Sequence, residues 1–294
     1  RGAADGCVAQ EMQRPRVPLG TVACLFLIVI VSKIGGDDSP PPSRPPPGRK
    51  VAVEFYSQGA PTHQYCGVTE LLTLPPHERS LNRGCIEAAE TLNNTFIHVE
   101  GIFDIASFKF IPWGNSYFGG LEGDTQYCQR TNPAGCNTKN GLEVWLDTCD
   151  AGARHPVPAG CWGKPALCQD GPNECLANKI QNCVVHLIKE KQQLAGRADS
   201  KPEFWNFIAC FENYTIPEDP SNDVKAPIET LRKCEEHLSN ADALAVKQCY
   251  EQTEGLGSQL EIDAANATAS LSPRHALIPW ILVDGQQTAA SQVL

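Results

Sequence analysis

The sequence is short of positive charge, with 24 Lys and Arg against 34 Asp and Glu and a formal net charge of −10. Phosphate binding needs clustered Lys and Arg, so this balance argues against nucleic acid or an anionic membrane surface as a partner. The sequence also lacks a G-x-S-x-G elbow, a phosphate-binding loop and a zinc-protease motif. No two cysteines have the C-x2-C spacing of a zinc knuckle. We therefore expect neither a metal nor a cofactor.

No apolar run has the length of a clear membrane span. The run Val17–Val31 is shorter than the roughly twenty residues that a helix needs to cross a bilayer. Two arginines precede it and small residues follow, a pattern typical of a secretory signal. An uncleaved signal anchor remains an alternative, because no clean A-x-A cleavage site follows the run. The chain would attach to a membrane only if this segment is such an anchor. Met12 is the sole methionine, so we expect residues 1–11 to be an upstream extension and residues 1–36 to hold this extension plus the signal peptide or anchor.

Cysteine, in contrast, is abundant, with fourteen residues. Oxidised cysteines at this density are common in secreted chains, although their pairing cannot be deduced from sequence. Three N-glycosylation sequons begin at Asn93, Asn213 and Asn266. Together with the signal-like segment, these features predict a disulfide-bonded glycoprotein that is secreted or resides in the endolysosomal lumen.

The composition changes twice along the chain. Residues 37–50 are proline-rich, which favours an extended linker, and the folded domain is expected over 51–294. Within it, residues 117–167 are rich in Gly, Asn, Pro and Thr and hold four cysteines. We interpret this range as a Cys-rich loop insertion held by its own disulfides.

Strand and helix patterns alternate through the folded domain. β-Branched and aromatic residues predict strands at 51–57, 105–111 and 277–283, and Asp284-Gly285 predicts a hairpin turn after the last of these. Helical composition marks 67–74 and 86–92, and three apolar stripes at helical spacing follow from Leu176 onward, the first stopped by Gly196. Four cysteines on or beside these stripes are placed where disulfides would lock helix to helix: Cys183, Cys210, Cys234 and Cys249.

This order of elements predicts an α/β fold, a thioredoxin-like core with a helical, disulfide-stapled insertion. Pro279 lies inside the last predicted strand, where proline is unusual unless it holds a cis peptide. In thioredoxin-like folds a cis-proline lies beside the active-site loop, and Pro279 would then line a substrate groove. A purely structural role, in which Pro279 ends a strand ladder, stays open.

One segment carries a specific resemblance. It runs from Cys168 to Cys183, and the residues that define its pattern are Cys168, Gln169, Gly171, Glu174, Cys175, Asn178 and Cys183. This string resembles the signature C-Q-H-G-x-x-E-C-x-x-N-x-x-x-x-C of the gamma-interferon-inducible lysosomal thiol reductase (GILT) family, with Asp170 in place of the histidine. Two flanking segments, 111–115 (IPWGN) and 275–285 (HALIPWILVDG), are similar to further family motifs. The resemblance covers about 51–287 except for the insertion.

The resemblance implies a thioredoxin-like fold and the reduction of protein disulfides in the acidic endolysosomal pathway. The partners would be disulfide-containing protein substrates or peptides. The signature residues are expected to brace the helix that follows them, with Glu174 favourable near its positive end.

The catalytic motif of the family is degenerate. An ungapped alignment from the first strand replaces C-P-x-C by Ala60-Pro61-Thr62-His63, whereas a gap of three residues aligns His63 and Cys66 with the two cysteines. Cys66 is then the only nucleophile that the loop offers. A helix N-terminus and the His63 imidazolium would both lower its thiol pKa. Alternatively, Cys66 is an inert half-cystine that pairs with Cys85 or another cysteine.

Two functions follow from these residues. The first is a GILT-family thiol–disulfide oxidoreductase of the secretory or endolysosomal pathway, with Cys66 as nucleophile and His63 beside it. The alternative is a catalytically inactive, secreted thioredoxin-like binding module that holds peptides or proteins in a groove around Pro279.

Overall fold

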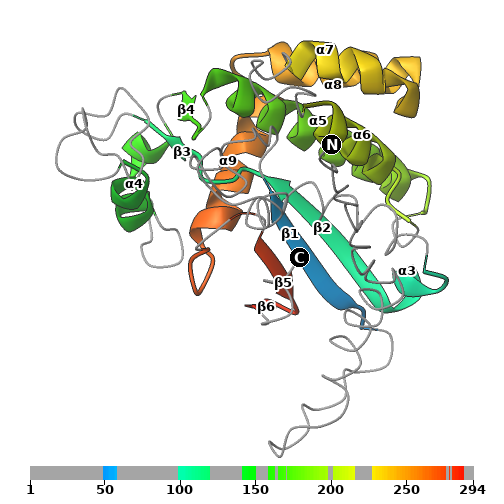
Figure 1. Cartoon of the computed structure of the whole chain (residues 1–294), viewed down its shortest axis with the longest axis horizontal. Helices are drawn as coiled ribbons and strands as arrows, with labels where there is room; N and C mark the ends of the chain where they lie inside the picture. Colours follow the sequence, from blue (N-terminus) through cyan, green and yellow to red (C-terminus); the bar gives the residue numbers. More distant parts are fainter. Residues whose placement is uncertain are drawn as a thin grey trace, which may run out of the picture. The chain divides into compact units, whose positions relative to one another are not determined.

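The chain divides between Pro46 and Pro47 into two units, and all described residues belong to the second (Figure 1). The computed structural model describes residues 49–57, 99–119, 141–149, 158–162, 165–169, 171–197, 201–215, 227–275, 278 and 280–287. The predicted signal segment, most of the proline-rich linker and the helices predicted at 67–74 and 86–92 lie outside these ranges. None of the helices within them is both long and apolar enough to cross a membrane.

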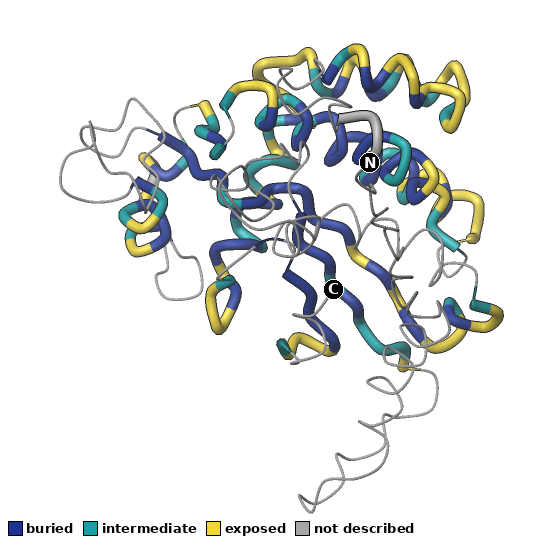
Figure 2. The backbone as a smooth tube through the Cα atoms, viewed as in Figure 1, coloured by how far each residue is buried: buried dark blue, intermediate teal, exposed yellow. Residues whose placement is uncertain are grey.

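A four-stranded mixed sheet forms one layer, in the order β2-β1-β5-β6. Strand β1 pairs in parallel with β2 and antiparallel with β5. Burial alternates at the start of β2 and becomes continuous at its end, as expected for a strand that passes into the core (Figure 2). The strand predicted at 51–57 is confirmed, and the second is displaced by one residue. The bounds are β1 (Val51–Ser57), β2 (Ala106–Pro112), β5 (Trp280–Val283) and β6 (Gln286–Gln287).

The predicted hairpin turn after β5 is confirmed. Asp284 and Gly285 have φ angles of 50° and 73°, the left-handed conformation that a two-residue type I′ turn requires. Asp284 also ties the turn to β1, because its Oδ1 accepts from the Ala52 N–H at 2.9 Å and its own N–H donates to the Ala52 carbonyl at 2.7 Å.

Helix α5 (Pro172–Leu194) is the central helix of the described region. It packs against β2 and against the helices α6, α7, α8 and α9 (Figure 1). Pro172 occupies the first turn of α5. Backbone N–H groups in the first turn have no acceptor within the helix, so proline, which lacks an N–H, costs no hydrogen bond there. The remaining helices are α3 (Ile102–Ile105), α6 (Phe204–Thr215), α7 (Pro227–Cys234), η4 (Glu235–His237), α8 (Asn240–Glu251) and α9 (Leu256–Ala269).

Two disulfides join these helices pairwise. Cys183–Cys249 links α5 to α8, and Cys210–Cys234 links α6 to α7. The expectation that cysteines on the apolar stripes would lock helix to helix is therefore confirmed. The described part of the chain is a mixed α/β fold with a small sheet, several helices and four disulfides.

The range expected to be a loop insertion contains regular structure. Leu142, Trp145, Leu146 and Cys149 fall on one face of a nine-residue helix, which explains why this stretch is helical. The Cys149–Cys161 disulfide lies entirely within the range. Its elements are β3 (Tyr117–Phe118), α4 (Gly141–Cys149), η3 (Ala159–Cys161) and β4 (Ala166–Leu167), with β3 and β4 paired antiparallel.

Candidate functional site

The candidate site lies at the edge of the sheet where β1 and β2 end. Ser57 and Pro112 are paired as the last residues of the two parallel strands. Strand β5 runs the other way, and its first residue, Trp280, pairs with Tyr56 at the same edge. Ligands of open α/β sheets bind beyond the carboxyl ends of parallel strands. This edge is therefore where a substrate site is expected.

A tight turn covers this edge immediately after β2. The Trp113 N–H donates to the Ser57 carbonyl at 2.8 Å, and Gly114 adopts a left-handed φ of 63°. From α5, the buried Asn178 Nδ2 donates to the Trp113 carbonyl and to Ser116 Oγ, both at 3.3 Å. The signature asparagine therefore fixes the position of the turn.

Glu174 adds a second contact from α5 to the same turn. Ser116 Oγ donates to Glu174 Oε1 at 3.4 Å, and both side chains are buried. Glu174 lies in the first turn of α5, where a carboxylate interacts favourably with the positive end of the helix dipole. Gly171, with a φ of 89°, is the N-cap residue of α5. The signature thus braces the turn and the start of the helix together.

Three segments distant in sequence meet through Asn115. Its Nδ2 donates to Gln169 Oε1 at 2.7 Å, and its Oδ1 lies 3.0 Å from His275 Nε2. Because Asn115 Oδ1 can only accept, Nε2 of His275 carries the proton. The 111–115 turn, the 168–183 signature and the 275–285 segment are thus joined by hydrogen bonds.

His275 is uncharged in this network. Burial lowers its pKa from 6.5 to about 4, because the charged imidazolium is poorly solvated in the interior. The ring therefore stays neutral at mildly acidic pH and serves as a fixed hydrogen-bond donor to Asn115.

The structure does not place every residue expected from the sequence. Ala60, His63, Cys66, Pro279 and the sequon residue Asn93 lie outside the described residues. Two further sequon residues fall within helices: Asn213 in α6 and the partly buried Asn266 in α9. Within the described ranges, no cluster of three or more His, Cys, Asp or Glu could hold a metal ion.

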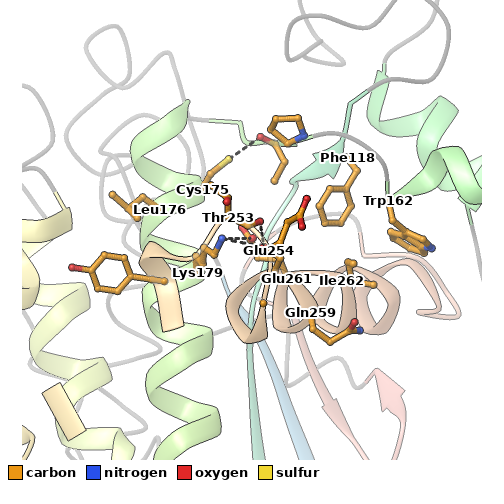
Figure 3. A pocket seen from close by; sticks show the side chains of 15 residues that line it. Phe118, Trp162, Cys175, Leu176, Lys179, Thr253, Glu254, Gln259, Glu261 and Ile262 are labelled. Atoms are coloured by element: carbon orange, nitrogen blue, oxygen red, sulfur yellow. Dashed lines mark hydrogen bonds and ion pairs between the residues drawn. The ribbon is translucent and has the colours of Figure 1, made fainter. Parts of the chain in front are cut away.

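Sequence reasoning missed a cavity of about 730 Å³ that borders α5. Lys179 lies on one wall with Glu261 beside it (Figure 3). Its Nζ is 3.3 Å from Glu261 Oε2 and donates to the Gln252 carbonyl and to Ser258 Oγ, each at 3.3 Å. The cavity depends on how the loop between α8 and α9 approaches α5, which no local pattern encodes. Its lining comprises Phe118, Trp162, Pro165, Ala166, Cys175, Leu176, Lys179, Tyr250, Thr253, Glu254, Gly255, Ser258, Gln259, Glu261 and Ile262.

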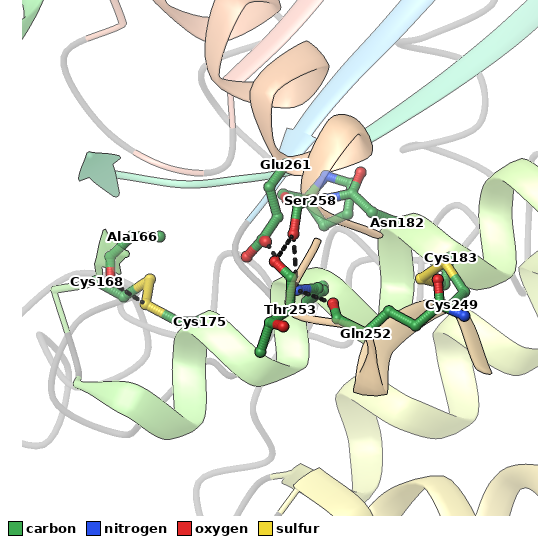
Figure 4. A network of polar contacts seen from close by, with 12 residues as sticks. Ala166, Cys168, Cys175, Asn182, Cys183, Cys249, Gln252, Thr253, Ser258 and Glu261 are labelled. Atoms are coloured by element: carbon green, nitrogen blue, oxygen red, sulfur yellow. Dashed lines mark hydrogen bonds and ion pairs between the residues drawn. A yellow bond between two sulfur atoms is a disulfide. The ribbon is translucent and has the colours of Figure 1, made fainter. Parts of the chain in front are cut away.

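The Cys168–Cys175 disulfide lies between the polar network and this cavity. Cys168 is buried close to Asn178, whereas Cys175 is half-buried and lines the cavity (Figure 4). The disulfide closes the short segment that leads into α5, and the Gly171 N–H donates to the Cys168 carbonyl at 3.1 Å within that segment.

A comparison with protein-family models identifies the region that contains the signature. Residues 158–253, which run from η3 to the end of α8, match the family model for gamma interferon inducible lysosomal thiol reductase (GILT). The resemblance inferred from the sequence is confirmed over this range.

Proposed function

We propose that the protein is a thiol–disulfide oxidoreductase with a thioredoxin-like core that acts on protein disulfides in the secretory or endolysosomal lumen. The observation that carries this proposal is the hydrogen-bonded meeting of the three motif segments through Asn115. They meet beside Ser57, the residue from which the chain continues toward His63 and Cys66. The four disulfides of the described residues support an oxidising compartment.

The proposed reaction uses one protein thiol. The Cys66 thiolate attacks a substrate disulfide, a new S–S bond forms to Cys66, and the other substrate sulfur leaves as a thiolate. Because the alignment that matches Cys66 to a motif cysteine places His63 at the other, no paired thiol is available there to resolve this mixed disulfide. An external thiol such as glutathione would release the substrate, and a second would regenerate Cys66, with glutathione oxidised to its disulfide. His63 would lower the pKa of the Cys66 thiol.

A binding module is the second candidate. The replacement of C-P-x-C by Ala60-Pro61-Thr62-His63 favours it, because both thiols of the motif are absent from the ungapped alignment. In this case the sheet edge and the groove around Pro279 would hold a peptide or partner protein without chemistry.

A disulfide-reduction assay with glutathione at acidic and neutral pH separates the two functions. The wild type should turn over, Cys66→Ser should lose turnover, and His63→Ala should reduce turnover by the largest factor at acidic pH, where the imidazole is protonated and the thiolate fraction depends most steeply on the thiol pKa. Cys85→Ser is the matched control: it should retain turnover, and an increase would show that Cys85 had been pairing with Cys66. Absence of turnover in the wild type, or full turnover in Cys66→Ser, would refute the oxidoreductase mechanism and leave the binding module.

A further inference from the structure

The eight half-cystines of the described residues differ in exposure. Six are buried, with at most 4% of their surface exposed, whereas Cys175 and Cys210 are half-buried. Of these two, Cys175 lines the cavity described above and Cys210 does not. We propose that the Cys168–Cys175 disulfide exchanges with cysteine thiols of peptides that enter this cavity, and that the Cys175 sulfur is the atom attacked.

Both sulfurs have neighbours that suit the opened state. Cys175 Sγ lies 3.4 Å from the Ala166 carbonyl oxygen, and Cys168 Sγ lies 4.0 Å from Asn178 Nδ2. A disulfide has no S–H to donate to the carbonyl and is a weak acceptor for the amide. After reduction, a Cys175 thiol can donate to the Ala166 carbonyl. Cys168 is accommodated as a neutral thiol, because burial disfavours a thiolate and both Nδ2 hydrogens of Asn178 already go to Trp113 and Ser116. The opened state with two thiols therefore fits these surroundings.

The exchange is balanced between a dithiol substrate and the protein. A substrate thiolate attacks Cys175 Sγ, the Cys168–Cys175 bond breaks, and the electron pair leaves on Cys168. A second substrate thiolate then attacks the mixed disulfide, so that a substrate disulfide forms and Cys175 leaves as a thiolate that takes up a proton. Two substrate thiols are oxidised and one protein disulfide is reduced to two thiols. The reverse sequence reduces a substrate disulfide.

Opening this disulfide leaves its surroundings held by other contacts. The two cysteines are seven residues apart, whereas the other three disulfides span 12, 24 and 66 residues. Backbone hydrogen bonds from Gly171 N–H to Cys168 O and from Cys175 N–H to Gly171 O hold the same segment without the S–S bond. The signature contacts of Asn178 with Trp113 and Ser116 are also independent of it. The chain can therefore open this bond and stay folded.

The cavity walls indicate which thiols fit. Phe118, Trp162 and Ile262 supply an apolar surface. The Lys179 ammonium is occupied by Glu261, Gln252 and Ser258, while Glu254 is exposed at the rim. A neutral or basic peptide whose cysteine is flanked by an aromatic residue is thus favoured over an acidic one.

This inference goes beyond the proposed function, because it uses neither His63 nor Cys66. Its first test is graded reduction of the folded Cys66→Ser chain by glutathione, followed by alkylation and peptide mapping. Cys168 and Cys175 should be alkylated before any other half-cystine of the described residues. Simultaneous opening of all four described disulfides, or earlier labelling of Cys210 and Cys234, would overturn the proposal. The turnover of Cys66→Ser in the disulfide-reduction assay, whether lost or retained, tests only the proposed function and not this inference.

The second test compares single half-cystines in the same background. Cys168→Ser leaves Cys175 free beside the cavity, and Cys234→Ser leaves Cys210, which is also half-buried, away from it. With glutathione disulfide as the probe, Cys168→Ser should form the mixed disulfide on the order of tenfold faster or more. Equal rates in the two variants would overturn the role of the cavity. Loss of the native circular dichroism spectrum would identify a variant that has unfolded.

The third test concerns the peptide class. Disulfide-linked dimers of cysteine peptides with a neighbouring Phe should react faster with the free Cys175 thiol of Cys168→Ser than dimers of peptides with a neighbouring Asp, each reaction releasing one peptide thiol. Trp162→Ala should reduce this preference. A preference for Asp, or one that Trp162→Ala leaves unchanged, would contradict the proposed substrate.

Discussion

Glu212 gives the fold a calculable dependence on pH. This α6 side chain is 2% exposed and its Oε1 accepts from Gln181 Nε2 at 2.7 Å. Burial raises its pKa from 4.5 to about 8, although the hydrogen bond from Gln181 acts in the opposite direction. The folded protein therefore keeps the carboxyl protonated at pH values where the unfolded chain has already ionised it.

The size of this effect follows from the shift in pKa. The stabilisation is fully present below pH 4.5 and is lost as pH rises towards about 8. It amounts to about 5 kcal/mol over that window, of which about half falls between pH 5 and pH 7. This is a large part of the roughly 5–15 kcal/mol by which domains are usually stable.

Glu212→Gln removes the titration and keeps the shape of the side chain. Urea unfolding at pH 5, 6, 7 and 8 would measure the free energy of unfolding of both proteins. The wild type should lose about 2–3 kcal/mol relative to the variant between pH 5 and pH 7. Glu229→Gln, the same substitution at an exposed residue of α7, is the control and should follow the wild type. A difference between wild type and Glu212→Gln that is independent of pH would refute the reasoning.

Three further predictions concern single contacts. His275 should titrate near pH 4, because burial lowers its pKa, and an NMR midpoint near 6.5 would contradict this. Gly257→Ala should lower the free energy of unfolding by about 1–3 kcal/mol, since its Cβ would lie 2.4 Å from the Cys249 carbonyl oxygen. The control Gly160→Ala meets nothing within 4 Å and should have little effect. Replacing Cys183 and Cys249 by Ala should lower the free energy of unfolding in urea by about 4 kcal/mol, because their disulfide spans 66 residues. A loss below about 1 kcal/mol would contradict that estimate.

Local signals predicted the sheet strands well. The β-branched and aromatic run 51–57 forms β1 with the expected bounds. Asp284-Gly285 forms the expected turn, because the left-handed conformation it needs is encoded in the dipeptide itself. The helix expected from Leu176 instead begins at Pro172. Gly171 and Pro172 are a local start signal that the apolar stripe alone did not include.

Helix α4 shows what the composition of a segment conceals. Gly, Asn, Pro and Thr dominate 117–167, yet Leu142, Trp145, Leu146 and Cys149 have helical spacing within it. The helical spacing of these four residues was present in the sequence. The loop-like average composition of the surrounding range nevertheless led to the prediction of a loop. Trp145 is 1% exposed and packs on Trp162 with ring centroids 5.6 Å apart. This burial explains why the helix is stable.

The site itself required three-dimensional information. Asn115 contacts Gln169 and His275, which are 54 and 160 residues away. The motifs marked these three residues as belonging to one family pattern, but no spacing stated that they touch. The disulfide pairings were undetermined for the same reason, since pairing depends on which helix faces meet.

Glu212 and His275 together predict how the fold responds to an acidic compartment. The raised pKa of Glu212 makes stability increase as pH falls from about 8 to 4.5, whereas the lowered pKa of His275 makes stability decrease as pH falls from 6.5 to about 4. Where the windows overlap the two contributions act in opposite directions, so the free energy of unfolding should vary less with pH between pH 4.5 and 6.5 than it does in Glu212→Gln. Above pH 6.5 the contribution of Glu212 dominates, and stability should decline by about 1–2 kcal/mol towards pH 8. Glu212→Gln should instead become less stable towards acid. A wild type that is most stable at pH 8 would show that these two groups do not set its pH dependence.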